Sequence, residues 1–257
     1  IAGAVTATRL GQVATLIVPH DFQLTECDGH QVKELGSPFE PLEPNSIEAV
    51  ASRLGTFHKV ALMLGGRALR KPGLNAAARI QKRIGCDLLA PTLPGYVERG
   101  PGLPIVPHLP YFLERAVDVI SRYEVVLLAG APEPVTFFGY PGVRSRILAD
   151  GQERIVLCAG RQDVVEALEC LADALGASSH PATGDDLLRK PERPEIQDGE
   201  LTAEKACLTL AALQPENAII VDEAVTTGLS YFLFPGALPA HTVMTVSGGS
   251  IGQGIPC

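Results

Sequence analysis

The chain has 257 residues, enough for one large domain or two, and its net charge of −8 argues against nucleic acid, which requires a basic face. Hydrophobic residues make up 46% of the chain. No apolar run approaches the roughly 18 residues of a membrane span. These values predict a soluble protein and exclude a membrane-spanning one.

The first 44 residues predict the edge of one domain and a linker. Residues 2–7 have the composition of a helix interior, and residues 14–18 form a short β-branched and apolar run that ends at Pro19. Such a run, bounded by a proline, fits a buried parallel strand. Residues 21–44 are proline-rich, with mixed charge and little periodicity, which predicts a linker across the surface.

The next segment alternates between strand and helix patterns. Asn45 and Glu48 have capping-box spacing, which predicts a helix start with an apolar stripe from Ile47 to Leu54. Apolar runs then predict strands at 60–64, 87–91, 124–128 and 154–158, and periodic patterns predict helices at 72–84, 112–120 and 164–175. A further strand at 104–110 is weakened by three prolines. Strands separated by helices indicate a parallel sheet covered on both faces.

Two glycine turns follow strands of this sheet. Gly65-Gly66 and Gly130 come where open α/β sheets bind ligands. The chain has no complete GxGxxG, so the signal for a dinucleotide is weak. These turns nevertheless keep one alternative open: a stand-alone nucleotide-binding Rossmann-like module.

The last third begins with a second linker. Residues 178–200 are polar and charged with little apolar content. Thr202 then fits the cap of a helix that ends at Leu213, and residues 218–221 form an apolar strand. The strand leads into an acidic pair, two hydroxyl side chains and a glycine, namely Asp222, Glu223, Thr226, Thr227 and Gly228. Backbone N–H groups and hydroxyls at such a turn suit an anion such as a diphosphate.

The end of the chain carries a glycine-rich run. Four glycines between Gly248 and Gly254 surround one large apolar side chain, Ile251. Glycine lets the backbone take positive φ or approach a ligand closely. The run therefore predicts a bound group held by main-chain atoms, although a glycine-rich loop before a small-residue helix is the simpler alternative.

The cysteine spacing and the two chain ends bear on metal binding, location and completeness. No two of the six cysteines have CxxC spacing, so neither a zinc site nor a disulfide framework is expected; they are Cys27, Cys86, Cys158, Cys170, Cys207 and Cys257. The absence of a signal peptide favours a cytoplasmic location. Because Ile1 falls within a helix-like pattern and Cys257 stops just after the glycine run, we expect the chain to be a fragment.

In order and spacing, the two stretches at 218–228 and 248–254 resemble the start of the diphosphate-binding domain of thiamine-diphosphate enzymes. The branch is that of acetolactate synthase, pyruvate oxidase and benzoylformate decarboxylase. The resemblance implies an α/β fold with a central parallel six-stranded Rossmann-like sheet, helices on both faces, and parts of two further α/β domains. It divides the chain into the end of a pyrimidine-binding domain (1–20), a linker (21–44), the central domain (45–177), a linker (178–200) and the start of the diphosphate-binding domain (201–257).

The resemblance also implies a cofactor site. In this family thiamine diphosphate binds between two subunits and is bent over one bulky aliphatic side chain, whose position Ile251 matches. Gly249 would offer its carbonyl to the pyrimidine amino group, and Ser250 lies between them in the same motif. Thr226 and Thr227 match positions that hydrogen-bond the diphosphate, and Glu223 matches part of an acidic pair at this turn. Structural alternatives remain: the threonines can cap a helix, and Ile251 can be core.

The implied activity is that of a thiamine-diphosphate-dependent transferase or lyase acting on a 2-keto acid, by decarboxylation or carboligation. The family works as a dimer or tetramer. Its catalytic glutamate would precede Ile1, and its Mg²⁺ ligands would follow Cys257. No catalytic residue or metal ligand is therefore assigned within the chain, which by itself is expected to be inactive.

The resemblance does not decide whether the central domain binds a flavin. The family's central domain carries FAD in acetolactate synthase and pyruvate oxidase, and nothing or another nucleotide in other members. Acetolactate synthases usually have an Arg-Phe-Asp-Asp-Arg-like run after the second glycine turn. Residues 131–142 here have a different sequence, Ala-Pro-Glu-Pro-Val-Thr-Phe-Phe-Gly-Tyr-Pro-Gly, which argues against FAD.

Overall fold

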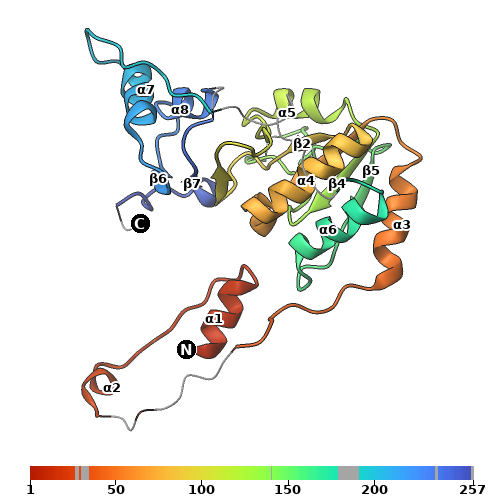
Figure 1. The fold of residues 1–257 in the computed structure, drawn as a ribbon, viewed down its shortest axis with the longest axis horizontal. Coiled ribbons are helices and arrows are strands. Elements are labelled where there is room, and N and C mark those ends of the chain that lie inside the picture. The colour runs from red at the N-terminus through yellow and green to blue at the C-terminus, as the bar shows by residue number, and fades with distance from the viewer. Residues whose placement is uncertain (27–28, 30–34, 140, 179–190, 235–236, 256–257) are drawn as a thin grey trace.

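A parallel sheet forms the core of the middle part of the sequence, on the right in Figure 1. The computed structural model describes residues 1–26, 29, 35–139, 141–178, 191–234 and 237–255. In strand order the sheet comprises β2 (Asp87–Leu89), β1 (Val60–Leu64), β4 (Val125–Ala129) and β5 (Glu153–Val156). All its pairings are parallel, and every residue of β1 and β4 is buried. This burial explains their continuous apolar sequences.

Helices cover both faces of this sheet. One face carries α3 (Pro44–Leu54), α4 (Lys71–Ile84) and α6 (Val164–Ala174), and the other carries α5 (Leu113–Ile120). Successive strand residues point to opposite faces, so Leu62 packs in the cluster with α4 and α6, whereas Met63 packs in the cluster with α5. The predicted α/β class, with a parallel sheet and helices on both faces, is confirmed.

The expected count of six strands is corrected by the structure. The central sheet has four strands in the described part of the chain. The segment predicted as a strand at 104–110 makes only a single parallel bridge, from His108 to Ala90 beside β2. Its three prolines have no N–H group to donate to a neighbouring strand. Backbone pairing is therefore limited to the hydrogen bonds around the His108–Ala90 bridge.

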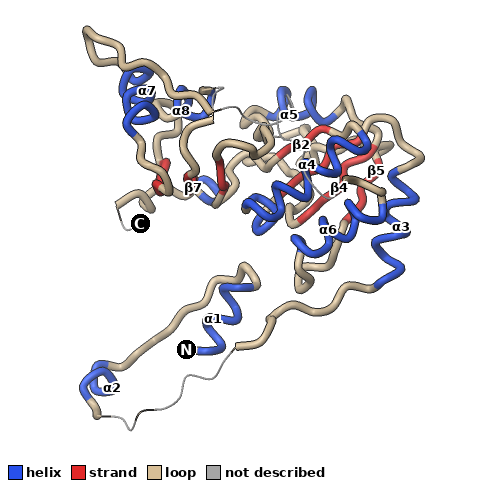
Figure 2. Tube along the Cα trace, in the orientation of Figure 1, coloured by secondary structure: helices blue, strands red, loops and turns tan. Residues whose placement is uncertain are grey.

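The start of the chain also departs from expectation. Two short helices, α1 (Ala2–Arg9) and α2 (His20–Leu24), are joined by an extended segment with no strand, drawn as loop in Figure 2. The predicted strand at 14–18 is therefore wrong: Ile17 is 84% exposed, and no described segment pairs with it. A strand forms only where a neighbour takes its backbone hydrogen bonds.

The start of α3 corrects one detail. The helix begins at Pro44, and the carbonyl of Glu43 accepts hydrogen bonds from both the backbone N–H and the hydroxyl of Ser46, at 3.0 and 2.7 Å. The predicted capping box of Asn45 and Glu48 is not formed, because Pro44 takes the first helical position, where its missing N–H costs nothing. The apolar stripe is confirmed by the buried Ile47 and Leu54.

A second sheet joins distant parts of the sequence. Its strand order is β3 (Val97–Arg99), β7 (His241–Thr245) and β6 (Ala218–Asp222), with β7 antiparallel to β3 and parallel to β6. Two helices, α7 (Ala203–Leu213) and α8 (Leu229–Leu233), pack against it around Tyr231 and Val243. The predicted cap of α7 is confirmed, since the Thr202 hydroxyl accepts from the Lys205 N–H at 3.2 Å. Strands β3 and β7 were not predicted.

Some sequence-based expectations concern residues that the structure does not describe. Residues 179–190 of the second linker, part of the first linker, Cys27 and Cys257 lie outside the described residues. Among the residues that are described, no helix is long and apolar enough to cross a membrane.

Candidate functional site

The two stretches singled out from the sequence meet at one edge of the second sheet. Strands β6 and β7 are adjacent and parallel, with Asp222 opposite Thr245. Their carboxyl ends therefore open at the same place. The turn at 223–228 follows β6, and the glycine loop at 246–254 follows β7. The carboxyl edge of a parallel pair is where α/β sheets bind ligands.

Glu223 fastens the glycine loop to the turn. One carboxylate oxygen, Oε1, accepts a hydrogen bond from the Gly252 N–H, and Oε2 accepts from the Gly254 N–H at 2.7 Å. Hydrogen bonds to a carboxylate are about twice as strong as neutral ones. A Cβ on Gly254 would lie 2.7 Å from Oε2, so a side chain there would push the carboxylate out of this position. The structure thus gives Glu223 a definite role: it holds the loop in place.

Asp222 shapes the start of the same turn. Its Oδ1 accepts from the Ala224 N–H at 2.9 Å, and burial raises the pKa of its carboxyl group. A Cβ on Gly228 would lie 2.7 Å from the same oxygen. A side chain at the glycine predicted at the helix start would therefore displace the Asp222 carboxylate.

Thr226 and Thr227 lie at the open side of the turn, and both are exposed. The Cys207 thiol donates to the Thr227 carbonyl at 3.0 Å, which ties the turn to α7. Within the described part of the chain, no hydrogen bond engages the backbone N–H groups of residues 225–227. Backbone N–H groups that lack an internal partner, beside two hydroxyls, can bind an anion.

The glycine loop presents its side chains outward. Gly249 has φ of +74°, in the region that favours glycine, and a Cβ there would lie 3.3 Å from Cε1 of Phe137. Ser250 is exposed, and Ile251 is 75% exposed. Ile251 is therefore not part of the core, and its exposure leaves it free to contact a ligand.

Residues from the middle of the chain support this loop, and sequence reasoning missed them. The Thr245 hydroxyl is buried and donates to the Pro94 carbonyl at 2.6 Å. A Cβ on Gly95 would lie 2.5 Å from the Ser247 hydroxyl oxygen. These contacts come from chain positions about 150 residues away, and no local pattern marks them.

An aromatic cluster beside Gly249 was also missed. The Phe137 ring is tilted by 33° against the Tyr111 ring, with 5.3 Å between the ring centroids. Phe112 and Phe138 lie 5.6 and 6.2 Å from Tyr111 by the same measure. All four side chains are at least 38% exposed. The Phe-Phe pair at 137–138 was visible in the sequence, but nothing in it pointed to the glycine loop.

A cavity of about 830 Å³ lies between α7, β6 and α8. Its walls are mostly apolar, and its polar groups include Asp222, Glu223 and Thr227. Among the described residues, no group of three or more His, Cys, Asp or Glu side chains could hold a metal ion.

Comparison with solved structures identifies the fold. The fold matches a Mycobacterium smegmatis protein provisionally described as a thiamin diphosphate-dependent enzyme, with a TM-score of 0.62, 21% identity, and 89% of this chain and 46% of the other covered. Benzoylformate decarboxylase from Polynucleobacter necessarius matches with a TM-score of 0.59 and 17% identity over 90% of this chain and 45% of the other. The fold is thus that of thiamine-diphosphate-dependent enzymes, although no family model matches the sequence.

One relative matches this chain with a higher sequence identity than these two structures do. A Mycobacterium tuberculosis protein provisionally named acetolactate synthase large subunit IlvX is 38% identical over 256 residues, which cover 98% of this chain and 48% of the relative. The predicted resemblance to thiamine-diphosphate enzymes of the acetolactate synthase branch is confirmed. The chain spans about half the length of the relatives it matches.

Proposed function

We propose that the chain is part of a thiamine-diphosphate-dependent enzyme of the acetolactate synthase type, acting on a 2-keto acid. One observation carries this proposal: the Glu223 carboxylate holds the glycine loop beside the turn of Thr226 and Thr227. The two stretches that the family uses for its cofactor are thereby joined. The similarity to IlvX supports this function over a stand-alone nucleotide-binding module.

The described residues fit the cofactor. Thiamine diphosphate, when bound, supplies an electron sink for the loss of CO2 from a 2-keto acid. The hydroxyls of Thr226 and Thr227 would hold its diphosphate, together with the N–H groups of residues 225–227, which have no hydrogen bond within the described part of the chain. The Gly249 carbonyl would accept a hydrogen bond from the pyrimidine amino group, next to Ser250. The exposed Ile251 would support the bent shape of the cofactor.

Further features of the proposal follow from the family. The Mg²⁺ ligands would follow Cys257, and the full protein would be a cytoplasmic dimer or tetramer, because the cofactor site needs two subunits. The central domain would span residues 45–177, between linkers at 21–44 and 178–200. The flanking residues 1–20 and 201–257 would belong to the pyrimidine-binding and diphosphate-binding domains.

Substitution of Ile251 tests the proposal in the full-length enzyme. Because Ile251 is 75% exposed within this chain, the fold of the chain does not depend on its side chain, and Ile251→Ala should change the free energy of unfolding of this chain by no more than about 0.5 kcal/mol. Turnover of 2-keto acids should nevertheless fall strongly, whereas Ile251→Leu and Ile251→Met should retain much of it because they keep the bulk. Ile255→Ala, which changes a fully exposed isoleucine directly after the glycine loop, is the matched control.

Hydrogen–deuterium exchange at the thiazolium C2, followed by NMR, isolates the step that depends on the cofactor's shape. Exchange should slow in Ile251→Ala and stay normal in Ile255→Ala. Normal exchange in a folded Ile251→Ala enzyme would contradict the role of Ile251. A full-length protein that neither binds thiamine diphosphate nor turns over any 2-keto acid would contradict the proposed function as a whole.

A further inference from the structure

The carboxyl edge of the central sheet is a second place where a ligand would be expected. In the strand order β2-β1-β4-β5, the chain leaves β1 toward β2 on one side of the sheet and leaves β4 toward β5 on the other side. A ligand crevice is expected at such a reversal, between the carboxyl ends of β1 and β4. Gly65, Gly66 and Gly130 lie there. FAD is the cofactor that the family places in some central domains, so the residues at this edge decide whether a flavin fits.

The two glycine turns pack against each other. The Gly65 N–H donates to the Ala129 carbonyl at 2.9 Å. A Cβ on Gly65 would lie 2.6 Å from the Gly130 carbonyl oxygen, and a Cβ on Gly130 would lie 2.5 Å from the Gly65 carbonyl oxygen and 3.4 Å from Val164 Cγ1. The close approach of the two backbones is therefore enough to explain Gly65 and Gly130, and no ligand is needed to explain them.

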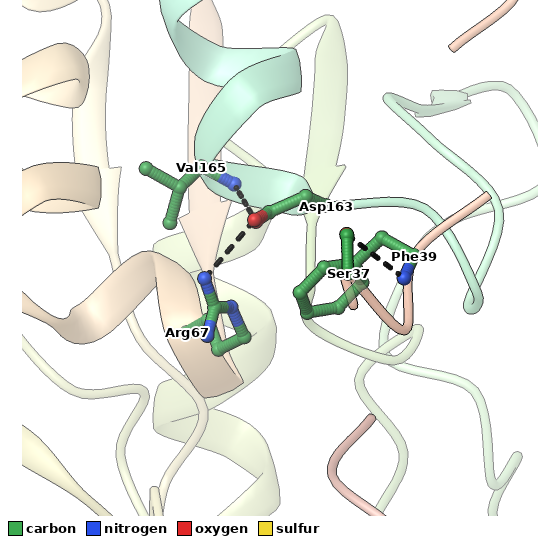
Figure 3. Close-up of polar contacts among 5 residues, drawn as sticks. All are labelled: Ser37, Phe39, Arg67, Asp163 and Val165. Atoms are coloured by element: carbon green, nitrogen blue, oxygen red, sulfur yellow. Dashed lines mark hydrogen bonds and ion pairs between the residues drawn. The ribbon is translucent and has the colours of Figure 1, made fainter. Parts of the chain in front are cut away.

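An ion pair crosses the same edge. Arg67 follows β1, and Asp163 precedes α6, which follows β5. Arg67 Nη2 lies 3.0 Å from Asp163 Oδ2 (Figure 3). Because β4 separates β1 from β5 in the sheet, the pair spans the end of β4.

The Asp163 carboxylate already serves the start of α6. Its Oδ1 accepts from the Val165 N–H at 3.0 Å, as Figure 3 shows, and its side chain is only 18% exposed. A phosphate binds at such a helix start by accepting the same kind of N–H bond. Asp163 thus takes the place of an external anion, and Arg67 balances its charge.

A segment of the first linker closes the edge from outside. We call residues 37–41 the strap. The Phe39 ring lies 4.7 Å from the Arg67 guanidinium carbon, as shown in Figure 3, and the Glu40 N–H donates to the Arg161 carbonyl at 3.0 Å. The Gln162 side-chain amide donates to the Pro41 carbonyl at 3.0 Å. An ion pair between Arg161 and Glu40, at 2.6 Å, adds a further link.

We propose that the crevice of the central sheet is filled by the protein's own groups and takes neither FAD nor another dinucleotide. The glycine turns pack against each other and leave no room for a ligand between them. The Asp163 carboxylate accepts the N–H bond at the start of α6 that a phosphate would accept, and Phe39 covers Arg67. An entering phosphate would meet the Asp163 carboxylate, which repels it, and the strap would have to detach. Arg67, Asp163 and the strap are then structural replacements for a cofactor.

Cofactor content of the purified full-length protein tests this directly. After denaturation, the supernatant should show no flavin fluorescence, and added FAD, NAD or ADP should leave Tm unchanged. One flavin released per chain, or a saturable rise in Tm with any of the three, would overturn the proposal. Neither measurement depends on thiamine chemistry, so a failure here is distinct from a failure of the proposed function.

Amide exchange tests the strap itself. Phe39→Ala and Arg67→Ala should each speed exchange of the Glu40 N–H on the order of tenfold, because each removes the stacked contact that holds the strap down. Arg53→Ala, which breaks an exposed ion pair to Glu153 elsewhere on the central sheet, is the matched control and should leave this exchange unchanged. Equal Glu40 exchange in all four proteins, wild type included, would show that the strap does not close the crevice.

Discussion

The carboxylate of Glu223 provides the sharpest test of how the candidate site is built. Replacing it by alanine removes both acceptors that hold the glycine loop, from Gly252 and from Gly254. Among the described residues, the Glu223 side chain has no other hydrogen bond or ion pair to lose through this change. The expected effect is therefore local: the loop opens more often, while the two sheets remain folded.

The magnitude follows from the kind of bond. A hydrogen bond to a charged group contributes about 1.5–3 kcal/mol, and the lower value applies here because Glu223 is partly exposed. Two such bonds amount to about 3 kcal/mol. Since about 1.4 kcal/mol corresponds to a factor of ten, amide exchange at Gly252 and Gly254 should accelerate on the order of a hundredfold.

Hydrogen exchange of the full-length protein, measured by mass spectrometry on peptides covering 246–254, is the assay. Glu223→Gln keeps one acceptor oxygen without the charge and should give an intermediate rate. Glu216→Ala, an exposed glutamate just before β6, is the control and should have no effect. Unchanged protection of the loop in Glu223→Ala would refute the reasoning, because the loop would then be held by something other than this carboxylate.

Two further predictions concern stability. Burial, together with nearby Arg99, lowers the pKa of His108 from 6.5 to about 4. The unfolded chain therefore takes up a proton that the folded one does not, and the free energy of unfolding should fall by about 3 kcal/mol between pH 6.5 and 4. Urea melts of His108→Asn should lack this part of the pH dependence; an identical dependence would count against it. Gly65→Ala should cost about 3 kcal/mol in thermal or urea unfolding, since its Cβ meets the Gly130 backbone, whereas Gly139→Ala, with open space around it, should be neutral.

The central sheet was predictable because its local patterns and its tertiary environment agree. Strands such as β1 and β4 are covered by helices on both faces, so burial imposes a continuous apolar sequence that is recognisable without any partner in view. The same holds for the turn after β6, where an acidic pair, hydroxyls and a glycine follow a strand. Patterns of this kind are set within a few residues of each other.

Pairing and contacts over long sequence distances were decided by the tertiary structure. The run at 14–18 has the composition of a strand but no neighbour among the described residues, whereas β3, with two charged residues in three, becomes a strand because β7 lies beside it. The sequence placed Glu223 and Ile251 in the same site through a family resemblance, but it did not show that a carboxylate holds the loop. Backbone N–H groups carry no side-chain signature, so their partners can be identified only when the folded chain brings them together.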